Sequence, residues 1–150
     1  MNLKFAVCLP RDAETVGIVR GVVANALRSF GVTPGCVEDI SLALSEACTN
    51  VIEHAAADDL YEVHLEVDET HCAISVKNTG IGFDSTALAG VMPGIDSPRG
   101  RGVAIMRAVM DQVEFSSEPE TGTIVHLVKT LSVDAGAPFA RLRRPTEPPG

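Results

Sequence analysis

The hydrophobic pattern changes from helical spacing to strict alternation near residue 60, and this change constrains the fold more than any other feature. Upstream, apolar residues recur at helical spacing over residues 12–30 and again from residue 34 to about residue 57. Downstream, residues 61–67 and 72–76 alternate apolar and other side chains around a polar connection at 68–70. The pattern predicts two amphipathic helices followed by a β-hairpin.

Local signals place the ends of the two helices. Asp12 is expected to cap the first helix, and Gly31 stands where a helix end needs a left-handed residue. The second helix is expected to begin at Pro34 with Thr33 as its cap. A first strand is predicted over residues 2–9, ahead of both helices.

The second half of the chain is predicted to add one helix and two strands. Helical spacing marks residues 103–110, and strands are expected from Val113 and over residues 123–131. Residues 84–100 are rich in Gly and Pro without periodicity, which is typical of a functional loop. The order β-α-α-β-β-loop-α-β-β predicts an α+β two-layer sandwich, with helices on one face of a mixed, mostly antiparallel sheet.

One domain accounts for most of the 150 residues, a length that allows a sizeable core. Residues 1–133 contain every predicted element, whereas residues 134–150 are rich in Pro, Gly and Arg and are expected to form a flexible tail. The chain lacks an apolar signal region and any run of transmembrane length. We therefore expect a cytoplasmic protein with no membrane partner.

Charge and composition limit the classes of partner. A formal net charge of -8 argues against direct binding to nucleic acid, which depends on neutralising phosphates with Lys and Arg. It is compatible with a protein partner that has a basic surface. The four cysteines include no C-x-x-C pair, so a zinc cluster is not expected. Cys8, Cys48 and Cys72 lie among apolar or small residues, and most of them are expected to be reduced core residues.

The first predicted helix has a second face of small residues, flanked by Arg20 and Arg28. Its members are Ala13, Gly17, Gly21 and Ala24. One interpretation is close packing against another element of the same chain. The other is a partner-binding surface that the two arginines anchor.

Glu46 and Asn50 lie four residues apart in the second predicted helix. Their side chains therefore project from one face, about 5 to 6 Å apart. A solvated helix face would explain a lone pair of this kind. The functional interpretation is that the Asn50 carbonyl oxygen binds magnesium beside Glu46, which acts as a general base.

Two glycine motifs flank the long loop. Asn78-Thr79-Gly80-Ile81-Gly82 follows a predicted strand, and its glycines remove side chains where a flat base could approach the backbone. Gly100-Arg101-Gly102 is expected to open a helix whose N–H groups and dipole attract phosphates, with Arg101 adding charge. Either motif alone is weak. Both in this order, downstream of Glu46 and Asn50, predict a nucleotide pocket.

These motifs resemble those of the GHKL ATPases, the superfamily of gyrase, histidine kinases and mismatch-repair proteins. Residues 46–55 are similar to its N-box, residues 78–82 to its D-x-G-x-G adenine box, and residues 100–106 to its second glycine box. The chain is most similar to the anti-sigma-factor serine/threonine kinases of bacterial partner-switching systems. The resemblance covers nearly all of residues 2–131 and implies the Bergerat fold.

The resemblance implies a role for each motif residue. Glu46 would be the catalytic base for a substrate hydroxyl, Asn50 the Mg²⁺ ligand, and residues 84–99 the lid over ATP. The cofactor-binding residues implied are Asn50, His54, Asn78, Gly80, Gly82, Gly100, Arg101, Gly102 and Val103.

Asn78 departs from the family pattern, which has Asp at the start of the adenine box. In the family, that carboxylate accepts a hydrogen bond from the adenine amino group. An amide oxygen can still accept this bond, but without a charge. The exchange would weaken binding by about 1 kcal/mol, so we expect reduced ATP affinity rather than its loss.

The resemblance implies an anti-sigma factor that is also an ATP- and Mg²⁺-dependent serine/threonine kinase. Such a protein would act as a homodimer, sequester an RNA-polymerase sigma factor and phosphorylate a small anti-anti-sigma (STAS-type) antagonist. The alternative is an anti-sigma module that binds nucleotide without phosphotransfer, which Asn78 favours and Glu46 and Asn50 disfavour. The ATPase domain of a histidine kinase is disfavoured because the chain has no room for a phosphoacceptor-helix domain. A plain α/β domain without nucleotide is a further alternative.

Overall fold

The computed structural model describes residues 2–54, 60–78, 98–118 and 122–134. These ranges contain three helices and five strands in the predicted order. The elements are β1 (Leu3–Pro10), α1 (Ala13–Ser29), α2 (Pro34–His54), β2 (Leu60–Val67), β3 (His71–Asn78), α4 (Pro98–Val109), β4 (Gln112–Glu118) and β5 (Gly122–Thr130).

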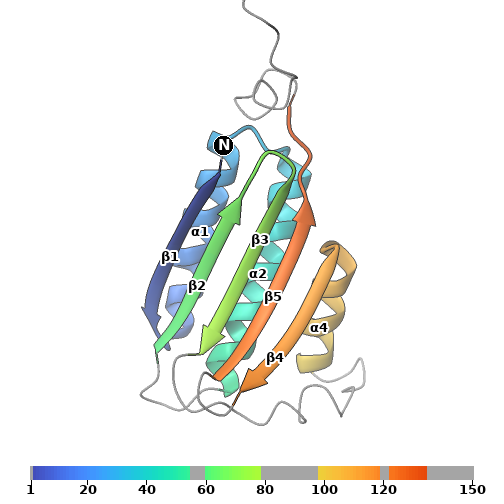
Figure 1. Cartoon of the computed structure of the whole chain (residues 1–150). Coiled ribbons are helices and arrows are strands. Elements are labelled where there is room, and N and C mark those ends of the chain that lie inside the picture. The colour runs from blue at the N-terminus through green and yellow to red at the C-terminus, as the bar shows by residue number, and fades with distance from the viewer. Residues whose placement is uncertain (1, 55–59, 79–97, 119–121, 135–150) are drawn as a thin grey trace, which may run out of the picture.

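The strands form one sheet in the order β1-β2-β3-β5-β4, and the helices lie behind it in a single layer (Figure 1). This arrangement confirms the predicted α+β sandwich with helices on one face. All four pairings among the described strands are antiparallel, so the sheet is more regular than the mixed sheet that we predicted. None of the described helices is long and apolar enough to cross a membrane.

The predicted boundaries of α1 and the start of α2 are confirmed. The Asp12 side chain accepts a hydrogen bond from the Glu14 N–H at 3.0 Å, and Gly31 has a φ of 82° just past the end of α1. The chain then enters α2 at Pro34, and the Val37 N–H donates to the Thr33 backbone carbonyl at 3.0 Å. A cap by the Thr33 side chain stays a prediction. The expected end of α2, near residue 57, lies outside the described residues.

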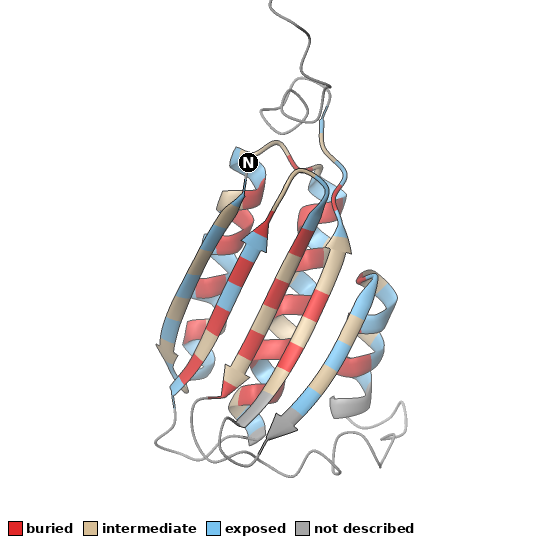
Figure 2. Cartoon of the chain, viewed as in Figure 1, coloured by how far each residue is buried: buried red, intermediate tan, exposed pale blue. Residues whose placement is uncertain are grey.

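An aliphatic core fills the space between the helices and the sheet. Buried and more exposed residues alternate along the strands (Figure 2), as expected for a sheet with one covered face. Cys48 and Cys72 belong to this core as predicted, and Cys36 is also buried. Cys8 is the exception among the three, because the alternation of edge strand β1 places it on the uncovered face.

The segment after β5 returns to the connection between α1 and α2. Val133 forms an isolated bridge with Val32, and the Asp134 N–H donates to the Gly31 carbonyl at 2.9 Å. The chain is therefore tied to the domain as far as residue 134. Residues 135–150 lie outside the described residues, and the predicted tail stays a prediction.

Candidate functional site

Glu46 and Asn50 of α2 meet Gly102 of α4 where the two helices approach each other. A Cβ atom built on Gly102 would lie 2.9 Å from Glu46 Oε2 and 3.7 Å from Asn50 Oδ1. Any side chain at position 102 would therefore enter the space that the carboxylate and the amide occupy. The structure thus joins two motifs that are more than fifty residues apart in the sequence.

Asn50 is buried although it is polar, with only 3% of its surface exposed. Its Nδ2 atom has no hydrogen-bond partner among the described residues. A buried amide without a partner costs about 1 to 3 kcal/mol, so its presence fits a site that a ligand completes. The amide oxygen is a type of ligand that Mg²⁺ accepts, and the amide N–H groups can donate to phosphate oxygens. The chemistry of Asn50 therefore fits both Mg²⁺ and phosphate.

Glu46 is half-buried beside Asn50. Its partial burial raises the pKa of the carboxyl group above that of an ordinary glutamate, and the negative charge of Glu53 raises it further. A carboxylate with a raised pKa is a stronger base, which suits proton abstraction from a hydroxyl. Sequence reasoning missed Glu53, although its spacing of seven residues from Glu46 places both on one face of α2.

Asn78 is fully buried at the last position of β3, opposite Tyr61 of β2. The Tyr61 hydroxyl is hydrogen-bonded to Thr15 near the start of α1, which fixes this corner of the core. Gly80 and Gly82 follow outside the described residues, so their approach to a base stays a prediction. The His54 side chain is also outside the description, although the backbone of His54 ends α2.

The start of α4 differs from the prediction. We expected Gly100-Arg101-Gly102 to open the helix, but α4 begins two residues earlier, at Pro98. Proline is favoured at a first helical position because it needs no N–H partner there. Pro98 therefore marks the start of α4, whereas the prediction relied on the glycine motif. Gly102 and Val103 are buried and Arg101 is exposed. The first N–H groups of a helix have no partner within the helix, so this turn is suited to bind an anion. The last two residues of the predicted lid, 98 and 99, belong to α4, and residues 84–97 lie outside the described residues.

Sequence reasoning also missed a hydrogen bond at the C-terminal end of α2. The Arg11 side chain, at the junction of β1 and α1, donates to the Ile52 carbonyl at 2.5 Å. This carbonyl belongs to the last turn of α2, where a cation is favourable. The contact spans 41 positions, and no local pattern indicates it.

Arg20 and Arg28 are both exposed on α1. They border a groove of about 410 Å³ between α1 and α2, which is lined by Gly17, Arg20, Gly21, Ala24, Arg28, Val37, Glu38, Ser41 and Leu42. Gly17 and Gly21 are exposed, and a Cβ atom on either would meet nothing within 4 Å. Close internal packing is therefore the wrong interpretation for these two glycines, although Ala24 is buried.

Comparisons with known proteins agree with the fold and the motifs. Residues 9–129 match the family model of the histidine kinase-like ATPase domain. The chain is 30% identical to the serine-protein kinase RsbW of Halalkalibacterium halodurans, over 84% of this chain and 82% of that protein. It is 31% identical to the anti-sigma F factor of Pasteuria penetrans, over 87% of this chain and 90% of that protein.

A solved structure shows the same fold. The crystal structure of the RsbU and RsbW domains of a Mycobacterium tuberculosis protein superposes with a TM-score of 0.64 at 19% identity. The match covers 88% of this chain and 33% of that chain, so this chain spans about one third of it.

Proposed function

Because the chain belongs to the family of histidine kinase-like ATPase domains, we propose that it is a serine/threonine-protein kinase and an anti-sigma factor. It uses ATP to phosphorylate an anti-anti-sigma protein of the STAS type and sequesters an RNA-polymerase sigma factor. The names of its relatives support both activities. The single structural observation that carries the proposal is the meeting of Glu46, Asn50 and Gly102 between α2 and α4.

We assign the residues of this site to different parts of Mg²⁺-ATP. When bound, ATP supplies the γ-phosphoryl group and Mg²⁺ neutralises charge on the phosphates. Asn50 would hold Mg²⁺ through Oδ1, while its Nδ2 donates to a phosphate oxygen. The N–H groups of the first turn of α4 and the Arg101 guanidinium would bind the remaining phosphate charge. Asn78 would accept a hydrogen bond from the adenine amino group.

Glu46 would act on the protein substrate. Its carboxylate would accept the proton of the serine or threonine hydroxyl as the hydroxyl oxygen bonds to the γ-phosphorus, while the bond from that phosphorus to the β–γ bridging oxygen breaks and ADP leaves. The raised pKa of Glu46 supports this role over that of an inert surface carboxylate. The presence of Glu46 beside Asn50, together with a relative named a serine-protein kinase, leads us to favour the kinase over the alternative, an anti-sigma module that binds nucleotide without transferring phosphate.

The groove between α1 and α2 is the proposed partner-binding surface. Arg20 and Arg28 line it together with Leu42, an apolar residue that is exposed on α2. Arginines around an exposed apolar side chain are a composition typical of interfaces. We assign this surface to the sigma factor or its antagonist, and we propose that the protein acts as a homodimer.

Arg20→Glu is expected to weaken association with a partner by about 2 kcal/mol or more, as for a buried interfacial arginine. ATP affinity should stay at the wild-type value, because α1 contains none of the pocket motifs. Titration of each partner by calorimetry measures the effect. Arg107→Glu, a charge reversal at an exposed position of α4, is the matched control. Wild-type affinity for both partners in Arg20→Glu would exclude this part of α1 from the interface.

Gly102→Ala is expected to displace Glu46 rather than to unfold the protein. The new methyl group would lie 2.9 Å from Glu46 Oε2, and this flexible side chain can rotate away. A displacement of about 1 Å can cost about 10²-fold in rate, so we expect transfer to fall by that order. Single-turnover phosphotransfer and urea unfolding measure the two effects. The control is Gly35→Ala in α2, where a Cβ atom meets nothing within 4 Å; equal transfer by both variants would refute the contact.

Co-purification from the native cell tests the proposed function as a whole. A tagged chain should retain a sigma factor and a STAS-type protein, and incubation with Mg²⁺-ATP should place phosphate on a serine or threonine of the latter. Mass spectrometry identifies the proteins and the modified residue. Retention of both proteins without any phosphorylation would favour the binding module, and retention of neither would reject the proposal.

A further inference from the structure

Lys129 lies on the helix-covered face of β5, where its neighbours are apolar. Val125 and Leu127 precede it on the same face and are fully buried. Only 17% of the Lys129 side chain is exposed. By contrast, Lys4 forms an exposed ion pair with Glu66, in which the two side chains are 66% and 52% exposed.

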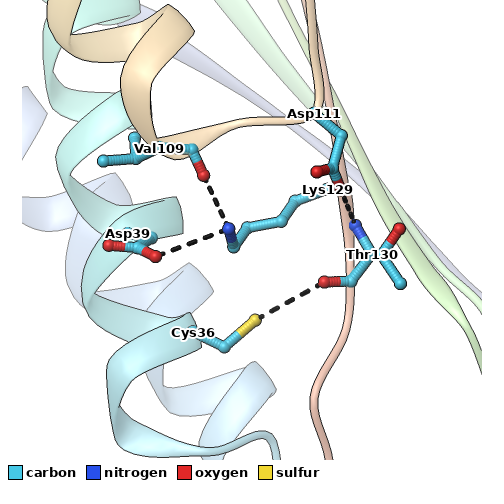
Figure 3. Close-up of polar contacts among 6 residues, drawn as sticks. All are labelled: Cys36, Asp39, Val109, Asp111, Lys129 and Thr130. Carbon is cyan, nitrogen blue, oxygen red and sulfur yellow. Dashed lines mark hydrogen bonds and ion pairs between the residues drawn. The ribbon is translucent and has the colours of Figure 1, made fainter.

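The Lys129 ammonium group joins three elements (Figure 3). Nζ donates to the carbonyl oxygen of Val109, the last residue of α4, at 2.6 Å, and lies 3.4 Å from Asp39 Oδ2 of α2. The last carbonyls of a helix have no partner within the helix, and a cation there is favourable. A charge-assisted bond of this kind, largely shielded from water, is stronger than an exposed ion pair.

The turn after α4 is held to β5 as well. The Asp111 N–H donates to the Val128 carbonyl at 2.9 Å. The Thr130 N–H donates to Asp111 Oδ2 at 2.5 Å (Figure 3). The bond from the Thr130 backbone lowers the pKa of Asp111 below its usual range. The C-terminal end of α4 is therefore attached to the sheet at several points.

This attachment and the Glu46 site lie at opposite ends of one helix pair. Gly102 and Val109 are seven positions apart on α4, and so are Asp39 and Glu46 on α2. Gly102 approaches Glu46, whereas Val109 is linked through Lys129 to Asp39. The two helices are thus antiparallel, and the contacts are separated by about 10.5 Å along them. The position of the last turn of α4 sets the position of its first turn.

We propose that Lys129 is a positioning residue for phosphate binding, which holds α4 against α2 so that the first turn of α4 stays beside Glu46 and Asn50. The inference rests on the proposed function, because it assigns the phosphates to that turn. It concerns only the phosphate end of the nucleotide. The expected adenine contact, Asn78, ends β3, whereas the register partner of Lys129 on that strand is Cys72. Six residues of an extended strand, about 20 Å, separate the two positions.

The test compares ADP with adenosine, which lacks phosphates, in calorimetric titrations with Mg²⁺. Lys129→Met retains the aliphatic stem and is expected to lower ADP affinity by about tenfold, with adenosine affinity unchanged. Lys129→Arg retains the cation and should restore most of the loss. Asp39→Asn is a milder second variant that keeps the lysine, and Lys4→Met is the control for loss of an exposed ion pair.

Hydrogen exchange without nucleotide provides an independent readout. Lys129→Met should accelerate amide exchange in residues 98–106 and leave residues 34–54 unchanged. Unchanged exchange in α4, or equal losses of ADP and adenosine affinity, would overturn the inference. If wild-type protein binds neither ligand, the proposed function fails, and exchange in α4 alone then decides whether Lys129 positions the helix.

Discussion

Glu46→Gln is expected to reduce phosphate transfer to the antagonist by about 10² to 10⁴, the usual cost of losing a general base. ATP affinity should change little, because the amide keeps the size of the carboxylate and Asn50 keeps its position. Rapid-quench single-turnover assays with labelled ATP measure transfer, and calorimetry measures binding. Full transfer by this variant would mean that the base is another group or that none is needed.

Glu53→Gln is the matched control for this experiment. Glu53 is an exposed glutamate on the same helix, and its charge contributes to the raised pKa of Glu46. Transfer should persist in Glu53→Gln. A base acts when deprotonated, and removal of this charge lowers the pKa of Glu46. The acidic limb of the pH profile should therefore move to lower pH in the control, whereas in Glu46→Gln that limb should disappear.

Asn50→Ala is expected to abolish the Mg²⁺-dependent part of ATP affinity. The substitution removes both the oxygen proposed to hold the metal and the Nδ2 donor that has no partner among the described residues. The ratio of ATP affinities with and without Mg²⁺ should fall to one. The free energy of unfolding without nucleotide should stay within about 1 kcal/mol of the wild-type value, because loss of an unpaired amide offsets the loss of packing.

Calorimetric titrations with Mg²⁺ and with EDTA measure this ratio, and urea unfolding measures stability. The control is Asn25→Ala, which removes an exposed amide from α1. A Mg²⁺ effect of wild-type size in Asn50→Ala would remove Asn50 from the metal site. A large decrease in the free energy of unfolding of Asn50→Ala would instead indicate that the Asn50 amide stabilises the folded chain.

Local chemistry explains which parts of the fold were predictable. Asp12 and Gly31 mark the ends of α1 through their own hydrogen bonding and φ angle, so the sequence predicts them directly. The strict alternation in β2 and β3 likewise predicts a hairpin with one covered face. The placement of β5 between β3 and β4 depends on contacts between distant segments, and no local pattern predicts it.

The site was predictable to the same extent. Helical spacing places Glu46 and Asn50 on one face, and the glycine motifs indicate a nucleotide, but only the fold shows that Gly102 meets both residues. The burial of Asn50 follows from the approach of α4, which periodicity within α2 cannot show. The links of Lys129 to Val109 and Asp39 are invisible in the sequence for the same reason.

The most direct test of the site is a calorimetric titration of the wild-type protein with ATP, with and without Mg²⁺. We predict saturable binding with one nucleotide per chain, strengthened by Mg²⁺ and weaker than in relatives with Asp at the position of Asn78. The absence of binding at millimolar ATP would contradict the assignment of Glu46, Asn50 and Gly102 to a nucleotide site.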